Sequence, residues 1–146
     1  MGKKSGTSKL TFWANQLGLG QRTGVDLPGE QAGDLPDLEW KKRELADEKP
    51  RRWDTWLPGD TINMSIGQGF LRATPLQMAR AYAALLDGRG AGEEHRLLTP
   101  AIGREIRDSK TGEVPHDLLK VRKETRLPPF NPRVLDTVLD GLYDVT

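Results

Sequence analysis

Apolar residues recur at helical spacing in several stretches of the chain. In the first stretch, residues 10–17, four residues fall on one helix face: Leu10, Trp13, Ala14 and Leu17. Ser8 can cap the start of this helix, and Gly18 with Gly20 can end it. The pattern therefore predicts a short amphipathic helix close to the beginning of the chain.

The most regular helical pattern opens at Thr74. Its hydroxyl can cap the helix, and Pro75 occupies the first helical position, where its missing N–H costs nothing. We expect this helix to end at Asp87-Gly88 and to be the centre of stability, with a buried apolar stripe of Leu76, Ala79, Ala83 and Leu86, widened by Tyr82 and Leu85. A last helix opens in the same way at Asn131 and Pro132, and its predicted buried face consists of Val134, Leu135, Val138, Leu139 and Leu142.

The region between these helices is less regular. A third helix is predicted at residues 37–46, with Asp37 as its cap, and its charged surroundings at 41–44 and 47–52 are interpreted as a solvated face or loop. Trp53 and Trp56 are expected to pin a loop onto the core. The start of the following segment, residues 61–66, is consistent with a short strand or an extended stretch, although its exact form is open.

Turn residues and alternation complete the pattern. Residues 23–36 are predicted to form an ordered loop, since Pro28-Gly29 suits a tight turn. Residues 97–108 alternate in part, 109–112 form a turn, and 113–115 begin a return, which predicts an exposed hairpin. The expected fold class is therefore α+β and mostly helical, with a peripheral hairpin.

Composition and charge exclude several kinds of protein. The 146 residues fit one domain, and 22 basic residues nearly balance 21 acidic ones, so nothing favours nucleic acid as a partner. The chain has no cysteine, which excludes disulfides, thiolate zinc sites and a cysteine nucleophile. No apolar stretch approaches the roughly 20 residues that a membrane span needs. Residues 1–8 are small, polar and lysine-rich, and we interpret them as a leader or a remnant of expression that precedes one subdomain at 9–146.

Four strings, in register along the chain, carry a more specific signal. They are Thr23-Gly24-Val25-Asp26-Leu27-Pro28-Gly29-Glu30, Trp56-Leu57-Pro58-Gly59-Asp60-Thr61-Ile62-Asn63, Ser65-Ile66-Gly67-Gln68-Gly69 and Thr74-Pro75-Leu76-Gln77-Met78-Ala79. Together they resemble the class B penicillin-binding proteins, and most closely the penicillin-binding protein 2 type, the elongation-type peptidoglycan D,D-transpeptidases. The resemblance spans about residues 9–146 and is thin at 39–52 and 93–130.

This resemblance implies a fold, an activity and a location. The fold would be the helical part of the β-lactamase-like transpeptidase domain, and the parent would cross-link peptidoglycan outside the cytoplasmic membrane. Its implied partners are peptidoglycan stem peptides, β-lactams and proteins of the elongation complex. Family enzymes use an active-site serine with a lysine three residues later, then a Ser-x-Asn motif, then a Lys-Thr/Ser-Gly-Thr motif. The resemblance places this chain after the second motif and before the third.

Two strings imitate the third motif. Lys110-Thr111-Gly112 is followed by Glu113 rather than threonine, and we interpret it as the tip of the hairpin. Lys4-Ser5-Gly6-Thr7 spells the motif more fully, but it precedes the first helix and lacks the apolar strand that should follow, so we interpret it as leader sequence.

The remaining candidates for chemistry are weak. No Ser-x-x-Lys occurs anywhere in the chain. His95 and His116 lack ligand-like spacing and are predicted to face solvent, whereas Asp34, Asp37 and Glu39 suit loop and cap roles. The sequence thus predicts no catalytic, cofactor-binding or metal-ligating residue, and hence a catalytically silent fragment of a transpeptidase. The alternative is a non-enzymatic binding module that presents this helical surface to a cell-wall partner.

Overall fold

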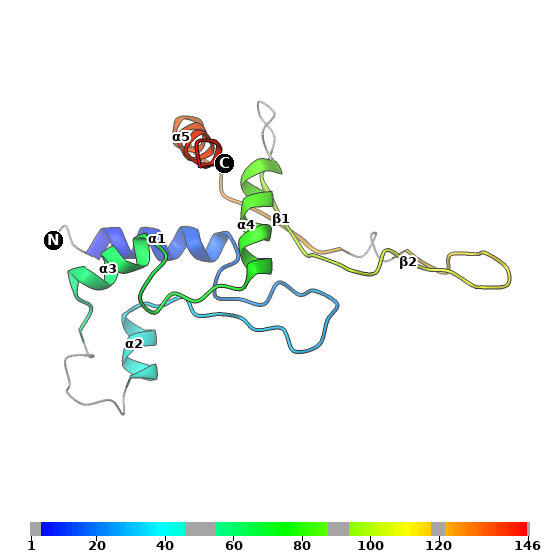
Figure 1. Cartoon of the computed structure of the whole chain (residues 1–146), viewed down its shortest axis with the longest axis horizontal. Coiled ribbons are helices and arrows are strands. Elements are labelled where there is room, and N and C mark those ends of the chain that lie inside the picture. The colour runs from blue at the N-terminus through cyan, green and yellow to red at the C-terminus, as the bar shows by residue number, and fades with distance from the viewer. Residues whose placement is uncertain (1–3, 46–54, 88–93, 118–121, 146) are drawn as a thin grey trace.

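A computed structural model describes residues 4–45, 55–87, 94–117 and 122–145. The described elements are, in order, α1 (Lys4–Gln16), α2 (Leu38–Glu44), α3 (Pro58–Ser65), α4 (Pro75–Asp87), β1 (Arg96–Leu98), β2 (Glu105–Ile106), β3 (His116–Asp117), β4 (Glu124–Arg126) and α5 (Pro132–Tyr143). Figure 1 shows a helical body from which a narrow ribbon of paired strands projects to one side. The expected mostly helical α+β fold with a peripheral hairpin is confirmed.

Helix α1 is longer than its apolar pattern indicates. It begins at Lys4, so Ser8 lies inside the helix and the prediction that Ser8 caps it was wrong. The hydroxyls of Thr7 and Thr61 lie 2.7 Å apart, which connects the first turns of α1 to α3. The division between a leader at residues 1–8 and a subdomain at 9–146 stays a prediction.

Helices α2 and α3 have defined starts. Asp37 caps α2 as predicted, because its carboxylate accepts a hydrogen bond from the backbone N–H of Trp40 at 2.7 Å. Residues 58–65 form α3 rather than a strand or extended stretch, which corrects the expectation for residues 61–66. Pro58 presets the φ angle of the first helical residue, and the Asp60 carboxylate accepts a hydrogen bond from the N–H of Leu57 at 2.8 Å. These local capping features favour a helix over a strand.

Helix α4 forms as predicted, but it buries a different face. The Thr74 hydroxyl accepts from the N–H of Gln77 at 3.2 Å, which confirms the cap, while the predicted end at Gly88 lies outside the described residues. The buried residues of α4 are Gln77, Ala81 and Ala84. The predicted stripe of Leu76, Ala79, Ala83 and Leu86 is exposed, as is Tyr82, and Leu85 is half-buried. Apolar spacing identifies residues that share a face, but it does not decide which face the rest of the chain covers.

Helix α5 shows the same discrepancy. Its cap is confirmed, because the Asn131 side chain accepts from the N–H of Arg133 at 3.1 Å. Of its predicted face, Leu139 alone is buried; Leu135 and Leu142 are half-buried, and Val134 and Val138 are exposed. In Figure 1, α5 lies at the edge of the body, with little of the described chain beside it.

The four strands form two short antiparallel pairs along one ribbon. β1 pairs with β4, and Leu97 lies opposite Thr125; β2 pairs with β3, and Ile106 lies opposite His116. At the tip, the Asp108 carboxylate accepts from the N–H groups of Lys110 and Thr111, both at 2.7 Å. Gly112 has a φ of +73°, a value that favours glycine, so the predicted hairpin turn is confirmed.

The apolar core lies where α4 meets β1 and the end of α1. It consists of Ala84, Leu97 and Leu127, with Leu17 and Phe130 packed against them. Phe130 stacks on Trp13 of α1 at 5.1 Å between ring centroids, which joins the segment before α5 to the first helix. Among the described residues, no helix has the length and apolar character that crossing a membrane requires.

Candidate functional site

Gln77, in the string at residues 74–79, has a fully buried side chain in α4 that contacts residues on either side of the string at 23–30. Its Nε2 donates to the carbonyls of Gln21 at 2.7 Å and Ala32 at 2.6 Å, and its Oε1 accepts from the N–H of Thr74 at 2.8 Å. We call Gln77 and these three partners the Gln77 cluster. It ties both ends of the loop at residues 21–32 to the start of α4.

The backbone beside this cluster is tightly packed. A Cβ at Gly33 would lie 2.3 Å from the carbonyl oxygen of Arg72, and Gly33 has a φ of +65°, so a side chain is excluded there. The next residue, Asp34, exchanges two backbone hydrogen bonds with Arg72, at 2.8 and 3.0 Å. Asp34 also accepts from the Trp40 indole at 3.4 Å, which confirms its structural role.

Two carboxylates organise the loop at residues 23–30. The Glu30 carboxylate accepts from the backbone N–H groups of Thr23 and Gly24, at 2.6 and 3.0 Å, and from the Thr23 hydroxyl. The Asp26 carboxylate accepts from the N–H groups of Ile102 and Gly103, at 2.8 and 3.0 Å. Glu30 therefore closes the loop on itself, whereas Asp26 connects the loop to the root of the hairpin.

These contacts predict an acid-induced change. Burial raises the pKa of Glu30, but the hydrogen bonds from Thr23 and Gly24 outweigh it and hold this pKa below its usual 4.5. A lowered folded-state pKa means that the contribution to stability is present above pH 4.5 and is lost as the pH falls through the folded value. We expect the amide resonances of Thr23 and Gly24 to shift together in an NMR titration, with a midpoint below pH 4.5.

The control for this titration is Glu30→Gln, which keeps the shape of the side chain and removes its charge. This variant should abolish the transition at Thr23 and Gly24. The backbone hydrogen bonds from Ile102 and Gly103 lower the pKa of Asp26 from its usual 3.8. A midpoint at or above 4.5 in the parent chain would contradict the Glu30 contacts.

A buried ion pair joins α2 to α3. Lys41 is fully buried, and its Nζ lies 2.6 Å from the Asp60 carboxylate and 3.1 Å from the Thr55 carbonyl. The same ammonium lies 5.9 Å from the Trp56 ring centroid and 6.0 Å from that of Phe70, within cation–π range. The interpretation of residues 41–44 as a solvated face was therefore wrong for Lys41. Trp56 is partly buried and reaches Thr61, as a loop anchor should, while Trp53 lies outside the described residues.

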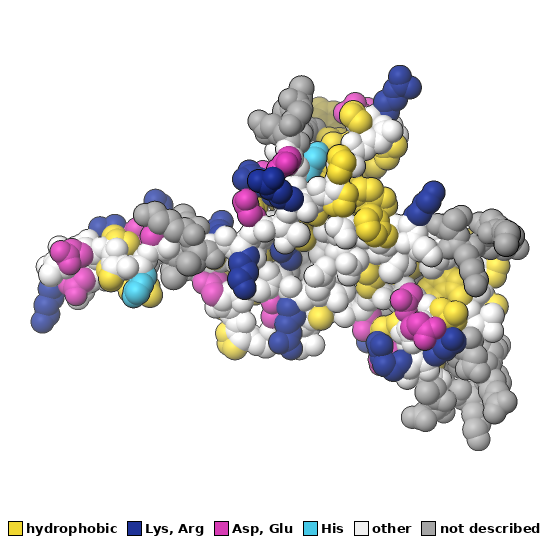
Figure 2. Space-filling model, turned by 180° about the vertical axis from the view of Figure 1, so that it is seen from behind, with side chains coloured by type: hydrophobic (Ala, Val, Ile, Leu, Met, Phe, Trp, Pro, Cys, Tyr) yellow, Lys and Arg dark blue, Asp and Glu magenta, His cyan; other side chains and the backbone are white. Residues whose placement is uncertain are grey.

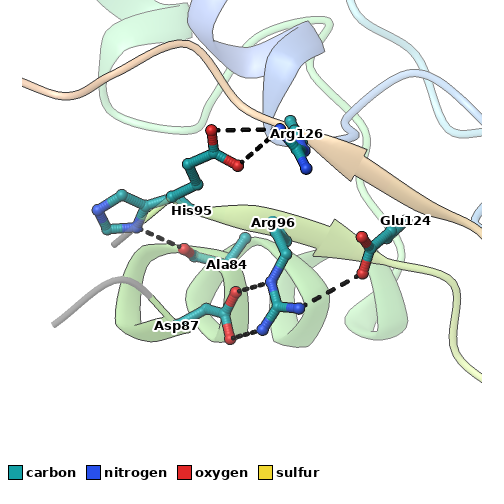
Figure 3. A network of polar contacts seen from close by, with 7 residues as sticks. Ala84, Asp87, His95, Arg96, Glu124 and Arg126 are labelled. Carbon is teal, nitrogen blue, oxygen red and sulfur yellow. Dashed lines mark hydrogen bonds and ion pairs between the residues drawn. The ribbon is translucent and has the colours of Figure 1, made fainter. Parts of the chain in front are cut away.

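Ion pairs connect the end of α4 to the two strands beside it (Figure 3). Arg96 of β1 bridges Asp87 at 3.0 Å and Glu124 of β4 at 3.4 Å. His95 is 7% exposed, its Nδ1 lies 3.0 Å from the Ala84 carbonyl, and its ring packs edge-on against Phe130. The prediction that His95 faces solvent was wrong, whereas His116 is exposed as predicted.

An open cavity of about 700 Å³ lies between the loop at residues 21–26, α4 and the strands. Four basic residues and one carboxylate, Asp26, are among the described residues that line it; the basic ones are Arg22, Arg80, Arg122 and Lys123. We call it the basic cavity. No signal in the sequence indicates this cavity, because three separate regions of the chain contribute its basic side chains.

Neither imitation of the third motif forms a catalytic strand. Lys110-Thr111-Gly112 lies exposed at the hairpin tip, as predicted. Lys4-Ser5-Gly6-Thr7 lies in the first turns of α1, a helix, so it does not have the strand geometry that the motif requires. In the described part of the chain, no three His, Cys, Asp or Glu side chains are placed to hold a metal ion. That no residue of the chain is catalytic stays a prediction.

Comparisons with known proteins agree on one family. The family model described as "Penicillin binding protein transpeptidase domain" matches residues 1–146. Peptidoglycan D,D-transpeptidase MrdA of Acinetobacter baumannii is 45% identical over 83 residues, which are 57% of this chain and 11% of that protein. MrdA of Escherichia coli is 38% identical over 96 residues, which are 66% of this chain and 14% of that protein. The chain thus spans a small part of the length of these relatives.

Solved structures give the same result. A crystal structure of Pseudomonas aeruginosa PBP2 in complex with WCK 5153 is similar with a TM-score of 0.59 and 28% identity, over 88% of this chain and 25% of that one. A complex between PBP2 and MreC from Helicobacter pylori is similar with a TM-score of 0.52 and 26% identity, over 94% of this chain and 21% of that one. The fold, the family model and the named relatives agree, and the chain belongs to the penicillin-binding protein transpeptidase domain family.

Proposed function

We propose that this chain is the scaffold portion of an elongation-type peptidoglycan D,D-transpeptidase and is catalytically silent by itself. The observation that carries the proposal is the 45% identity to the MrdA transpeptidase of A. baumannii. Its contribution to cell-wall cross-linking would be mechanical: it holds the helices that support a catalytic centre built from other parts of the parent.

The contacts of the chain suit such a supporting role. Acyl transfer by a serine enzyme needs a nucleophile, a base and oxyanion donors fixed in mutual geometry. The Gln77 cluster fixes a loop to α4, and the Lys41–Asp60 pair fixes α2 to α3. Buried polar contacts of this kind hold elements in one arrangement when every partner is satisfied, and no described buried side-chain polar atom lacks a hydrogen-bond partner.

The relatives support a location and partners for the proposed parent. The proposed parent acts on peptidoglycan stem peptides at the periplasmic face of the cytoplasmic membrane and is a target of β-lactams. A partner from the elongation complex is supported by the H. pylori structure, which is a complex between PBP2 and MreC. A ligand site in the parent is supported by the P. aeruginosa structure, which is a complex of PBP2 with WCK 5153.

The first test is labelling with a fluorescent penicillin. Because no Ser-x-x-Lys occurs in the chain, we expect no covalent adduct by gel fluorescence or intact-mass spectrometry. The matched positive control is MrdA of A. baumannii under the same conditions. A stoichiometric adduct on the 146-residue chain would contradict catalytic silence.

The second test asks whether the chain supports the chemistry of a complete enzyme. The matching segment of A. baumannii MrdA is replaced by this chain, and penicillin labelling of the chimera is measured. We expect labelling to be retained, and Gln77→Leu in the chimera should reduce it by destabilising the scaffold. A chimera that folds, as judged by circular dichroism, but does not label would contradict the proposed role.

A further inference from the structure

The basic cavity has the features of a binding site for an anion. Its volume of about 700 Å³ falls within the roughly 300–1,000 Å³ of small-molecule sites. Within the described part of the chain, Arg22, Arg80, Arg122 and Lys123 form no ion pair with a carboxylate. Their charges therefore remain available to a ligand.

The carboxylates close to the cavity are already engaged. Asp26, which lines it, accepts two backbone hydrogen bonds from Ile102 and Gly103, although Arg122 also lowers its pKa. Glu30 accepts from Thr23 and Gly24 and interacts electrostatically with Arg22 and Arg80. These two acids offset part of the positive charge and leave a surplus that a multiply charged anion would neutralise.

Arg80 is held in position without a ligand. Its Nε donates to the carbonyl of Leu98 at 2.6 Å, and an Nη1 lies 3.3 Å from the place that a Cβ on Gly18 would occupy. The guanidinium is thus fixed by α4, β1 and the turn after α1. Burial lowers the pKa of Arg80, and the charge of Glu30 opposes this effect, so a further anion would stabilise the charged guanidinium.

The other three basic side chains are exposed and surround this fixed one. Arg22 comes from the loop before Thr23, while Arg122 and Lys123 come from the segment that leads into β4. Figure 2 shows Lys and Arg side chains on the body of the molecule, near the place where the ribbon of strands leaves it. Guanidinium groups match phosphate oxygens in a bidentate geometry, and a lysine adds a point charge.

We propose that the basic cavity binds a small molecule that bears phosphoryl groups. Four cationic side chains line the cavity, and Asp26 is the one carboxylate among its described lining residues. A ligand with phosphoryl groups, which carry several negative charges, therefore fits better than a ligand with a single carboxylate. The volume exceeds that of one phosphate group, and the remaining lining mixes apolar residues with the polar side chains of Asn15, Gln21, Thr99 and Thr125, which can contact the body of the ligand. This proposal does not depend on the function proposed above.

The probe for this proposal is inorganic pyrophosphate, titrated into the 146-residue chain in low-salt, phosphate-free buffer and followed by calorimetry. We expect saturable binding at one site. Arg22→Gln and Lys123→Gln should each weaken it roughly tenfold or more, since hydrogen bonds to charged groups are among the strong ones. Both residues are exposed, so both variants should keep the thermal unfolding of the parent chain.

The matched control is Arg133→Gln on α5, which removes the same charge from an exposed position that is not among the cavity-lining residues. It should change the affinity less than twofold. The proposed site would be overturned if Arg133→Gln weakened pyrophosphate binding as much as the cavity variants do, or if the chain showed no saturable pyrophosphate binding. Citrate that binds as tightly as pyrophosphate would overturn the preference for phosphoryl groups.

A second experiment distinguishes two possible sources of the phosphoryl group, a lipid headgroup and a free phosphorylated molecule. Vesicles that contain phosphatidylglycerol are tested for binding and for competition by pyrophosphate. Vesicle binding that pyrophosphate displaces would assign the site to a lipid headgroup, whereas pyrophosphate binding alone would assign it to a free phosphorylated molecule. Vesicle binding that pyrophosphate does not displace, in a chain without saturable pyrophosphate binding, would overturn the proposal.

Discussion

Replacing Gln77 by leucine should lower the free energy of unfolding by about 3 kcal/mol or more, because buried polar groups left without partners cost on the order of 1–3 kcal/mol each. Leucine fills a similar volume in α4 but removes both the donor and the acceptor of a fully buried polar side chain. The carbonyls of Gln21 and Ala32 and the N–H of Thr74 would lose their partner. Urea denaturation followed by circular dichroism measures the change.

The matched control is Gln31→Leu. Gln31 lies in the same loop, and its side chain makes a single exposed contact, with the Gly29 carbonyl at 3.4 Å. This control should change the unfolding free energy by no more than about 0.5 kcal/mol, as surface substitutions usually do. Equal effects of the two substitutions would show that the Gln77 cluster does not hold the loop to α4.

Replacing Lys41 by methionine should cost about 3–5 kcal/mol, since breaking a buried ion pair leaves one charge without its partner. Methionine retains most of the aliphatic length, so the loss arises mainly from the ammonium group. Asp60 would keep its hydrogen bond from the N–H of Leu57 but would lose the cation at 2.6 Å. Chemical denaturation again reports the change in unfolding free energy.

Lys42→Met is the adjacent control. Lys42 pairs with Glu39 at 3.1 Å on the surface, where the two side chains are 46% and 77% exposed, and such pairs contribute at most about 1 kcal/mol. A double variant, Lys41→Met with Asp60→Asn, should lose less unfolding free energy than the sum of the losses of the two single variants. The reason is that Asp60→Asn removes the carboxylate charge that Lys41→Met alone leaves without its partner. Strict additivity would contradict a direct interaction between Lys41 and Asp60.

The local sequence determined the starts of three helices. Asp37, Thr74 and Asn131 cap their helices as predicted, because an N-cap needs only a short polar side chain and the next few N–H groups. The hairpin turn at 109–112 was likewise determined by neighbours in sequence, above all Asp108 and Gly112. The family also followed from local strings, and a match of the transpeptidase family model to residues 1–146 confirms it.

Tertiary structure decided which residues are buried. His95 and Lys41 were predicted to face solvent. Instead, Phe130 packs against His95, and Asp60 forms an ion pair with Lys41. Both partners are distant in sequence from the residues that they contact. The α4 stripe that includes Leu76 was predicted to be buried, but the side that carries Gln77 and Ala84 is the covered one.

The basic cavity could not be predicted from the sequence either, because Arg22, Arg80 and Arg122 are far apart along the chain. Caps, turns and periodicity depend on interactions within a few residues, which a sequence displays directly. Burial and charge clusters depend on which surfaces meet when distant segments pack together. For this chain, the sequence by itself determined the starts of three helices, the hairpin turn and the family. Packing decided which faces are covered and where the polar and basic groups gather, because both depend on contacts between distant segments.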